Sequence, residues 1–245
     1  MLAFGIRYLN GFAAASEPDS RERAEWPPHP GRVFMALAAA HFLTGEEPAE
    51  RQALVWIESL PTAPSIIAGE ATARAAVTQY VPVNDKAGPS KTLLQSVPLT
   101  RDRQPRLFAR AFFDSDTVYL SWPDIDPPEA IRRALESLSA KVTRIGHSSS
   151  LVQMWLATAD EIGEANWVPD DDRAQLYLRV AAPGTIEDLE QSHFSRPSGR
   201  SRGTAGSAGQ NRRCESHSPL SCSQRPHRPT SRKVLSSRAS IAIRR

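Results

Sequence analysis

Cysteine is nearly missing from this chain of 245 residues, and both copies, Cys214 and Cys222, lie near its carboxyl end. Residues 1–190 therefore have no side chains for a disulfide or a thiolate metal site, which fits a reducing compartment and predicts a cytoplasmic protein. Long apolar runs are missing as well, since none reaches the roughly 18–20 residues that a membrane-spanning helix needs. The start, MLAFGIRYLNG, lacks a basic segment followed by a long apolar one, so we expect no signal peptide.

Acidic and aromatic side chains are nearly missing from the last part of the chain. Residues 191–245 contain 12 basic side chains, a single acidic one, Glu215, and Phe194 as their only Phe, Trp or Tyr. Residues 1–190 contain 18 basic and 26 acidic side chains, a net charge of −8, so the overall charge of +3 describes neither part. We predict a folded domain over residues 1–190 and a disordered Ser/Arg-rich tail over residues 191–245, which has too little apolar surface to offset the entropy of ordering.

Hydrophobic periodicity within residues 1–190 predicts a mixture of strands and helices. Leu2, Phe4, Ile6 and Tyr8 alternate with small or polar residues, which is typical of a half-buried strand. The pattern predicts strands at 2–8, 77–81, 151–157 and 176–180, a hairpin of 107–113 with 117–122, and helices at 31–43, 48–60 and 126–142.

This order predicts an α+β protein with a ferredoxin-like βαββαβ fold that carries an inserted helix and a long loop. The loop, residues 85–106, mixes Gly, Pro, Lys, Thr and Arg. Loops of this length inside compact domains are usually functional or disordered. The fold does not assign a function, because ferredoxin-like domains serve as enzymes, metal carriers and RNA binders alike.

No pattern in the sequence predicts a metal site, a cofactor or an activated nucleophile. His29, His41 and His147 lie far apart and lack the spacing of metal ligands. GxSxG, P-loop and GxGxxG motifs are absent. We therefore expect no metal and no cofactor, and we expect His41, inside an apolar helix, to be a packed side chain.

A basic segment in this otherwise acidic domain is more informative. Only Asp85 and Asp102 oppose its six cations, so that the local charge is +4. Clustered Arg and Lys beside an exposed sheet suit contacts with phosphate, which favours RNA or DNA binding, and the alternative is a soluble loop paired with the domain's excess acids. The six cations are Lys86, Lys91, Arg101, Arg103, Arg106 and Arg110.

Five segments of residues 1–190 resemble a known family when taken in order: LAFGIRYLNGFAAA, EWPPHPGRVFMAL, LSWPDIDPP, RIGHSSSLVQMW and LYLRVAAPGTIEDLE. They resemble the CRISPR-associated subunit of type I-U (also called I-G) systems. In that family a RAMP half that binds the handle of the CRISPR RNA (crRNA) is fused to a RAMP half that processes crRNA. The resemblance implies a ferredoxin-like fold and a Cascade subunit of antiviral defence. Such a subunit grips crRNA and assembles with the other subunits of the interference complex.

The resemblance adds three RNA-binding candidates, Arg32, Arg144 and His147. Arg32 lies at the start of a helix, where a cation is unfavourable unless it reaches a phosphate or a carboxylate. Arg144 and His147 flank Gly146, which permits a tight turn, so a structural role for this turn is the alternative. We expect Trp26, with the prolines that follow it, to fix the first helix against the sheet rather than to stack on RNA.

The tail allows three interpretations. It is a disordered basic arm that binds nucleic acid, a Ser/Arg-rich regulatory segment, or a stretch translated out of frame from about residue 192 onward. The last hypothesis rests on the preference of residues 1–190 for Arg (15) over Lys (3), which is consistent with a G+C-rich gene, and on the break in composition where the resemblance stops, near Glu190. The nucleotide sequence around codons 190–200 tests it.

Whether the chain is an enzyme stays open at this point. In the resembled family an endoribonuclease half follows the APGTIEDLE segment, and RAMP endoribonucleases cleave RNA without a metal, usually with a histidine as general acid or base. Our main hypothesis is a truncated, non-catalytic crRNA-binding subunit with no assigned catalytic residue. The alternatives are a crRNA-processing endoribonuclease that uses His41 or His147, and a protein-interaction scaffold whose partner binding is independent of RNA and insensitive to salt.

Overall fold

The structure is a computed structural model, and it describes residues 1–74, 76–82, 103–170, 176–194 and 239–244. The chain divides into two units, residues 1–186 with 237–245, and residues 187–236. Of the described elements, only helix α5 (Thr185–Phe194) extends into the second unit. The remainder of the fold is therefore the fold of the first unit.

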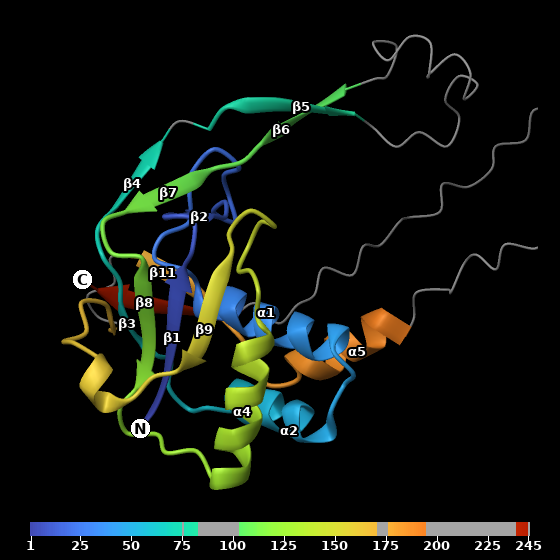
Figure 1. Cartoon of the computed structure of the whole chain (residues 1–245), viewed down its shortest axis with the longest axis vertical. Coiled ribbons are helices and arrows are strands. Elements are labelled where there is room, and N and C mark those ends of the chain that lie inside the picture. The colour runs from blue at the N-terminus through green and yellow to red at the C-terminus, as the bar shows by residue number, and fades with distance from the viewer. Residues whose placement is uncertain (75, 83–102, 171–175, 195–238, 245) are drawn as a thin grey trace, which may run out of the picture. The chain divides into compact units, whose positions relative to one another are not determined.

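A four-stranded antiparallel sheet forms the centre of the first unit (Figure 1), in the spatial order β3–β8–β1–β9. Two helices connect β1 to β3 and one helix connects β8 to β9, which is the βαββαβ order with one inserted helix. The predicted ferredoxin-like α+β fold is confirmed. The elements are β1 (Leu2–Tyr8), α1 (Pro30–Leu43), α2 (Pro48–Glu58), β3 (Ser65–Ile67), β8 (Thr117–Trp122), α4 (Glu129–Lys141) and β9 (Val152–Leu156).

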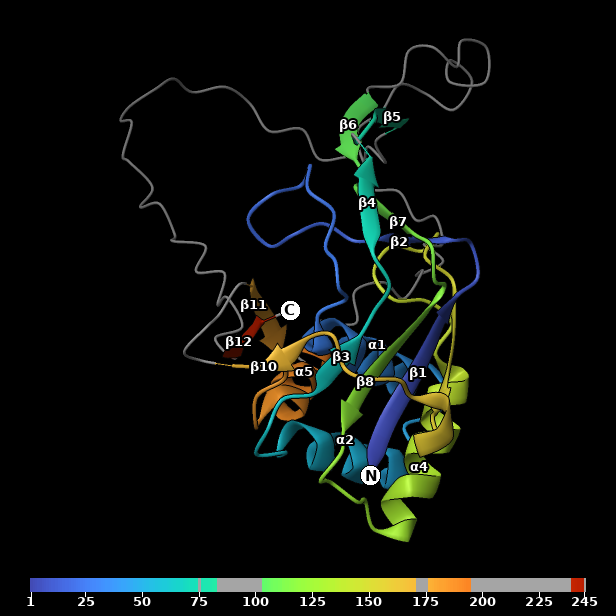
Figure 2. The ribbon, with the colours of Figure 1, turned by 90° about the vertical axis from the view of Figure 1, so that its left-hand side faces the viewer.

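The core lies between this sheet and the three helices, which pack together beside it (Figure 2). Strand β1 supplies Phe4 and Ile6, and the helices supply apolar side chains at the spacing of one helical face. Each such side chain contributes about 1.5–3 kcal/mol by leaving water. The fully buried leucines of the helices are Leu37, Leu54, Leu135 and Leu138.

Strand β1 is more deeply buried than its alternating sequence predicts. Ala3 and Gly5 are buried on the second face of the sheet, and only Arg7 is exposed. Gly5 pairs with Trp155 of β9, and a Cβ at residue 5 would lie 2.4 Å from the indole ring. The indole covers this face of β1, so the prediction of a half-buried strand was wrong because a cross-strand aromatic side chain covers the glycine.

The predicted hairpin of residues 107–113 with 117–122 was also wrong. Strand β7 (Arg110–Phe113) pairs with β2 (Phe12–Ala14) and β4 (Ala71–Arg74), whereas β8 pairs with β1 and β3. The place beside β8 is occupied by β1, and the backbone N–H of Tyr8 donates to the carbonyl of Asp116 at 2.7 Å. The residues between β7 and β8 therefore connect two different sheets and do not form a hairpin turn.

The true hairpin is much longer and bends from one sheet into the next. Its outgoing strands are β3, β4 and β5 (Thr78–Pro82), and its returning strands are β6 (Arg103–Leu107), β7 and β8. The outer part, β5 with β6, is a two-stranded ribbon that extends beyond β4 and β7 (Figure 1). Residues 83–102, most of the predicted long loop, lie outside the described residues.

A third small sheet contains the end of the chain. It has the order β10–β12–β11, where β10 is Val168–Pro169, β11 is Leu176–Val180 and β12 is Ala239–Arg244. Ile241 pairs with Leu178 and Ile243 with Leu176. Residues 239–244 thus form a strand within the predicted disordered tail, because residues 241–243 are a short apolar run in which Ala242 and Ile243 are buried. Residues 195–238 lie outside the described residues.

Candidate nucleic-acid interface

The sheet of β2, β7 and β4 presents basic and aromatic side chains on one of its faces. Its register places Phe12 and Thr72 opposite Phe112, and it places Arg74 opposite Arg110. Directly paired residues share a face and side chains alternate between faces, so one face contains every second residue of each strand. We call this surface the Arg–Phe face, which consists of Phe12, Ala14, Thr72, Arg74, Arg110 and Phe112.

The opposite face of this sheet is anchored in the protein. Ala13 and Ala111 are buried there, and the ring of Phe113 stacks on Trp26 with a centroid distance of 4.7 Å and an angle of 20°. The indole N–H of Trp26 donates to the carbonyl of Gly69 at 3.0 Å. Trp26 thus packs against the sheet of β2, β7 and β4, and the predicted role of fixing the first helix stays a prediction.

Two arginines lie directly opposite each other on the Arg–Phe face. Like charges in this position destabilise a sheet. Each guanidinium carbon lies over a phenylalanine ring of the neighbouring strand, Arg74 at 4.3 Å from the centre of Phe112 and Arg110 at 4.7 Å from the centre of Phe12. These cation–π contacts are each worth about 0.5–1 kcal/mol at exposed sites. Among the described residues, no carboxylate pairs with either guanidinium.

A cavity of about 180 Å³ opens beside these arginines. Arg74, Arg110 and Phe112 line it together with Val77, Gln79 and Phe108. Its walls are therefore aromatic and cationic, and they contain no carboxylate. Such a lining accepts a planar, anionic or electron-rich group.

His147 lies at the edge of the same surface. Gly146 has a φ of +86°, which confirms the predicted tight turn, and the turn lets the backbone N–H of His147 donate to the carbonyl of Ala14 at 2.9 Å. The imidazole contacts the ring of Phe108 at 4.5 Å. Its Nδ1 accepts the backbone N–H of Ser149 at 3.2 Å, so the neutral ring has its proton on Nε2. His147 is exposed and presents an N–H donor next to the Arg–Phe face.

The ribbon of β5 and β6 continues from the Arg–Phe face and bears two more predicted cations. Arg103 and Arg106 are exposed on β6, and Arg106 pairs with Gln79, which lines the cavity. Tyr80 on β5 is 64% exposed. An isolated two-stranded ribbon is only marginally stable in water. A partner that covers the exposed ring of Tyr80 would stabilise this ribbon.

Arg32 is engaged elsewhere, by a carboxylate. Its Nε donates to Oε1 of Glu25 at 2.7 Å and its Nη2 donates to Oε2 at 2.6 Å. Glu25 is 1% exposed, and it also accepts from Nη2 of Arg179 and from the backbone N–H of His29, both at 3.2 Å. Burial raises the pKa of Glu25, but the hydrogen bond and charge of Arg32 and the backbone hydrogen bond of His29 outweigh it and leave this pKa below its usual value.

His29 completes this cluster, which joins the EWPPHPGR and LYLRV segments. Its Nδ1 accepts the backbone N–H of Arg179 at 3.2 Å and the Nε of the same arginine at 3.3 Å. Burial lowers the pKa of His29, Arg179 and Arg32 lower it further, and the charge of Glu25 only partly compensates. The neutral imidazole is therefore the form that this cluster holds, and its role is to fix the start of α1 to β11.

The structure separates the nine RNA-binding candidates into groups. Arg103, Arg106, Arg110 and His147 lie on or beside the Arg–Phe face and its ribbon, whereas Arg32 contacts Glu25. Arg144 is exposed, and its backbone forms an isolated antiparallel β-bridge with Leu151, next to the turn of His147. Lys86, Lys91 and Arg101 lie outside the described residues.

Sequence reasoning missed Arg74, Phe12 and Phe112. A signal for them exists in the alternation of ATAR at 71–74 and RAFF at 110–113. Each of these segments has only four residues, and the incorrect hairpin assigned the wrong partner to the second. The pairing of β7 with both β2 and β4 is what makes this surface visible.

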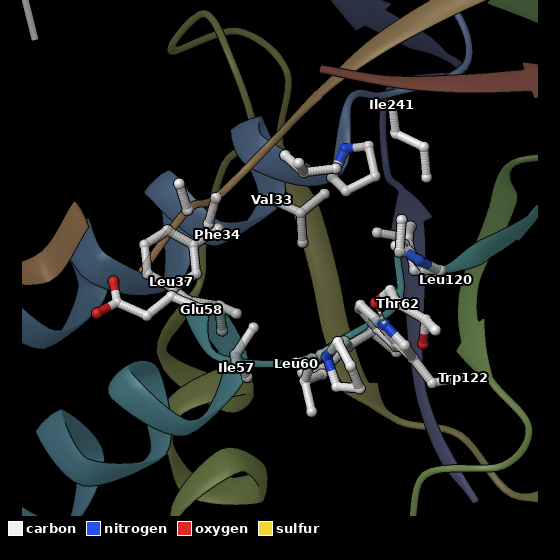
Figure 3. Close-up of a pocket in the computed structure, with 18 of the residues that line it drawn as sticks. Val33, Phe34, Leu37, Ile57, Glu58, Leu60, Thr62, Leu120, Trp122 and Ile241 are labelled. Atoms are coloured by element: carbon white, nitrogen blue, oxygen red, sulfur yellow. Dashed lines mark hydrogen bonds between the residues drawn. The ribbon is translucent and has the colours of Figure 1, made fainter. Parts of the chain in front are cut away.

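A largely apolar cavity of about 270 Å³ lies elsewhere, between α1, the end of α2 and β8 (Figure 3). Val33, Leu37, Leu120 and Trp122 line it. The carboxylate of Glu58 at its edge accepts the backbone N–H groups of Gly184 and Ile186. This cavity is part of the core and has no cation for a phosphate.

Within the described residues, His, Asp, Glu and Cys side chains form no cluster of three that could hold a metal ion. His41 is 2% exposed, as predicted for a packed histidine, and its Nδ1 lies 3.3 Å from Oε2 of Glu50. No helix in the described part of the chain is both long and apolar enough to cross a membrane.

Comparison with known proteins gives one family. Residues 4–229 match the family described as CRISPR-associated protein, GSU0054 family. This match runs past residue 190, where the segments quoted from the sequence end. No curated protein matches the chain.

Two similar solved structures are a CRISPR protein from Archaeoglobus fulgidus and a Cas6 product complex. The first is 13% identical with a TM-score of 0.29, and the alignment covers 64% of this chain and 63% of that one. The second is 14% identical with a TM-score of 0.23, and the alignment covers 64% of this chain and 51% of that one. This chain thus spans less than two thirds of the length of either protein.

Proposed function

Because the chain belongs to the GSU0054 family of CRISPR-associated proteins, we propose that it binds crRNA through the Arg–Phe face. The observation that carries this proposal is the directly opposed pair Arg74 and Arg110, which has no carboxylate partner among the described residues. A phosphate between or beside the two guanidiniums removes the repulsion that the pairing creates.

The charge of the surrounding domain strengthens this argument. Residues 1–190 have a net charge of −8, so a cationic surface is not a consequence of a generally basic protein. A local cluster of cations within an acidic domain restricts a polyanion to that cluster and repels it from the remaining surface. Arg103 and Arg106 on the ribbon extend the cationic track along a strand of RNA, and His147 at the edge adds an N–H donor to it.

The assignment of this chain to a particular type of CRISPR complex rests on the five sequence segments quoted above. They support a subunit of a type I-U interference complex in the cytoplasm, with crRNA and the other subunits of that complex as partners. In this proposal residues 1–190 correspond to the handle-binding half and the chain is non-catalytic. The tail beyond residue 190, with its excess of arginine, is either an additional nucleic-acid-binding arm, a regulatory segment or an out-of-frame sequence.

One observation favours a second candidate, metal-independent cleavage of crRNA. His147 is exposed beside the Arg–Phe face and has its proton on Nε2, whereas His41 is buried against Glu50. Of these two histidines only His147 is accessible to RNA as a general acid or base. Scission of the cognate repeat RNA by the wild-type chain and not by His147→Ala identifies this activity. Intact RNA in both reactions leaves the chain a binding protein.

Fluorescence anisotropy with the repeat RNA encoded beside the gene tests the main proposal. Arg74→Ala with Arg110→Ala removes two phosphate contacts, so we expect weaker binding and a slope of log K against log salt that is smaller by about 1–2. Arg133→Ala on α4 is the matched control, because the side chain of this arginine is 75% exposed and pairs with Glu129 in its own helix. Equal affinities of the double variant and the control would contradict the proposal. Partner binding that persists without RNA and at high salt would favour a protein scaffold instead.

A further inference from the structure

We infer that the Arg–Phe face is specific for unpaired RNA, whose bases stack on the guanidinium planes of Arg74 and Arg110. This inference rests on the proposed function and adds to it the state of the RNA and the way in which it is held. The observation behind it is that the guanidinium carbons of both arginines lie over phenylalanine rings of the neighbouring strands.

Each arginine and its ring form a layered platform. The guanidinium is planar, and a ring within about 6 Å of it holds that plane by cation–π attraction. The guanidinium carbons lie 4.3 Å and 4.7 Å from the ring centres, and in this proposal a base stacks on the side of each guanidinium that is turned away from its ring. Arg74 is exposed, and Arg74 and Arg110 both line the cavity of about 180 Å³. A base that enters from this cavity completes a stack of base, guanidinium and phenyl ring.

The two platforms are neighbours, because Phe12 and Phe112 pair directly across β2 and β7. Directly paired residues of antiparallel strands have Cβ atoms about 4.5–5.5 Å apart. The face therefore offers two adjacent stacking sites, one of Arg110 on Phe12 and one of Arg74 on Phe112. Two consecutive nucleotides with splayed bases satisfy both sites.

Paired RNA cannot use this arrangement. In an A-form duplex the base faces are covered by neighbouring base pairs, and a protein reaches mainly the phosphates and the 2′-hydroxyl groups. Unpaired nucleotides expose their faces and stack on aromatic rings and guanidinium planes. A surface that bound only the phosphates of a duplex would bind them better with cations that extend into water. Its affinity would not depend on the two phenylalanine rings.

The same geometry predicts weak base preference. Among the residues of the face and of the adjoining cavity, the uncharged polar side chains are Thr72 and Gln79. Every base has two π-faces, so stacking tolerates all four of them. We expect decamers of uridine and of adenosine to bind within about fivefold of each other.

Lysine substitution separates stacking from charge. Arg74→Lys and Arg110→Lys keep the positive charge but remove the planar group. For a fluorescein-labelled uridine decamer we expect each substitution to weaken binding by at least about fivefold while the salt dependence is retained. A blunt ten-base-pair RNA duplex should bind more weakly than the decamer and should be insensitive to the lysine variants. Arg133→Lys is the matched control.

A second readout reports the stack itself. Phe112→Leu keeps an apolar side chain but removes the ring beneath Arg74, and we expect it to weaken decamer binding to a similar extent as Arg74→Lys. Decamers that contain 2-aminopurine should change in fluorescence on binding to the wild type and much less on binding to the lysine variants. Circular dichroism melting establishes that each variant is folded.

The outcomes separate this inference from the proposed function. If the lysine variants bind the decamer as tightly as the wild type but the double alanine variant does not, the face binds RNA by charge and the stacking inference is wrong. If duplex and decamer bind equally, the specificity for unpaired RNA is wrong. If neither lysine nor alanine substitutions change RNA affinity, both the inference and the proposed function fail.

Discussion

Replacement of Glu25 by glutamine should destabilise the protein far more than replacement of a surface carboxylate. Glu25 is almost completely buried, and its two oxygens accept hydrogen bonds from Arg32, Arg179 and the backbone of His29. The side chains of Arg32 and Arg179 are only 24% and 30% exposed. Glutamine has nearly the same shape but no charge, so the substitution leaves two guanidiniums in a largely buried site without their counterion.

The expected magnitude follows from this burial. Removal of one partner of a buried ion pair costs about 3–5 kcal/mol, because the other partner stays desolvated. With a urea m-value of about 2 kcal/mol/M, the midpoint of unfolding should fall by about 1.5–2.5 M. Urea titrations of wild type and Glu25→Gln, followed by far-ultraviolet circular dichroism, measure this shift directly.

Glu17→Gln is the matched control. Glu17 accepts from Arg23 at 2.8 Å, but the side chain of Arg23 is 62% exposed, and exposed pairs of this kind contribute about 0–1 kcal/mol. We expect a midpoint shift below about 0.5 M for this variant. Equal shifts for the two variants would refute the reasoning, because they would mean that the cluster of Glu25 is solvated and contributes as a surface pair does.

Two further predictions concern pH and the turn of His147. In the folded protein the pKa of His29 is held below its usual value of about 6.5. At a pH between these two pKa values, the unfolded chain binds a proton on His29 that the folded chain does not. Stability should therefore fall as pH decreases from about 6.5, by up to about 1.4 kcal/mol per pH unit, and His29→Asn should flatten that part of a melting-temperature profile. A slope that is unchanged in His29→Asn would contradict this assignment. The lowered pKa of Glu25 acts in the same direction at lower pH, since its stabilisation is present above about pH 4.5 and is lost as pH falls through the folded value. Gly146→Ala should destabilise the protein by about 1–3 kcal/mol and weaken RNA binding, because residue 146 has a φ of +86° and a Cβ there would lie 2.6 Å from the carbonyl oxygen of Ala14. Gly163→Ala, with nothing within 4 Å of its added Cβ, is the control in the same urea titration, and equal midpoints of the two variants would count against a strained turn.

The elements that the sequence predicts well are those with a long and regular pattern. Strands β1, β8 and β9 and helices α1, α2 and α4 each extend over five or more residues, and they supply three of the four strands and all the connecting helices of the ferredoxin-like order. Strands β3 and β4 have three and four residues, too few for a period to be recognised. Strand β12 is preceded by a long Ser/Arg-rich segment that conceals its short apolar run.

The candidate site was only partly predictable for a related reason. The basic segment indicates Arg103, Arg106 and Arg110 by composition alone. Arg74 becomes their neighbour only through the pairing of β4 with β7, and Phe12 only through the pairing of β2 with β7. These contacts join residues 36 to 100 positions apart in the chain, and a local pattern contains no information on them. Arg32 was correctly expected to need an anionic partner, but the sequence did not distinguish Glu25 from a phosphate.

The place of β1 at the centre of the main sheet has a consequence for synthesis on the ribosome. Its neighbours are β8 and β9, and Leu2 pairs with Trp122. At about 5–20 residues per second, the apolar segment Leu2–Tyr8 is made roughly 5–25 s before β8 exists to pair with it. During that interval the segment that later lies deepest in the core is a free strand in the nascent chain, so chaperone capture or the early packing of α1 and α2 against it decides how much of the newly made protein reaches its fold.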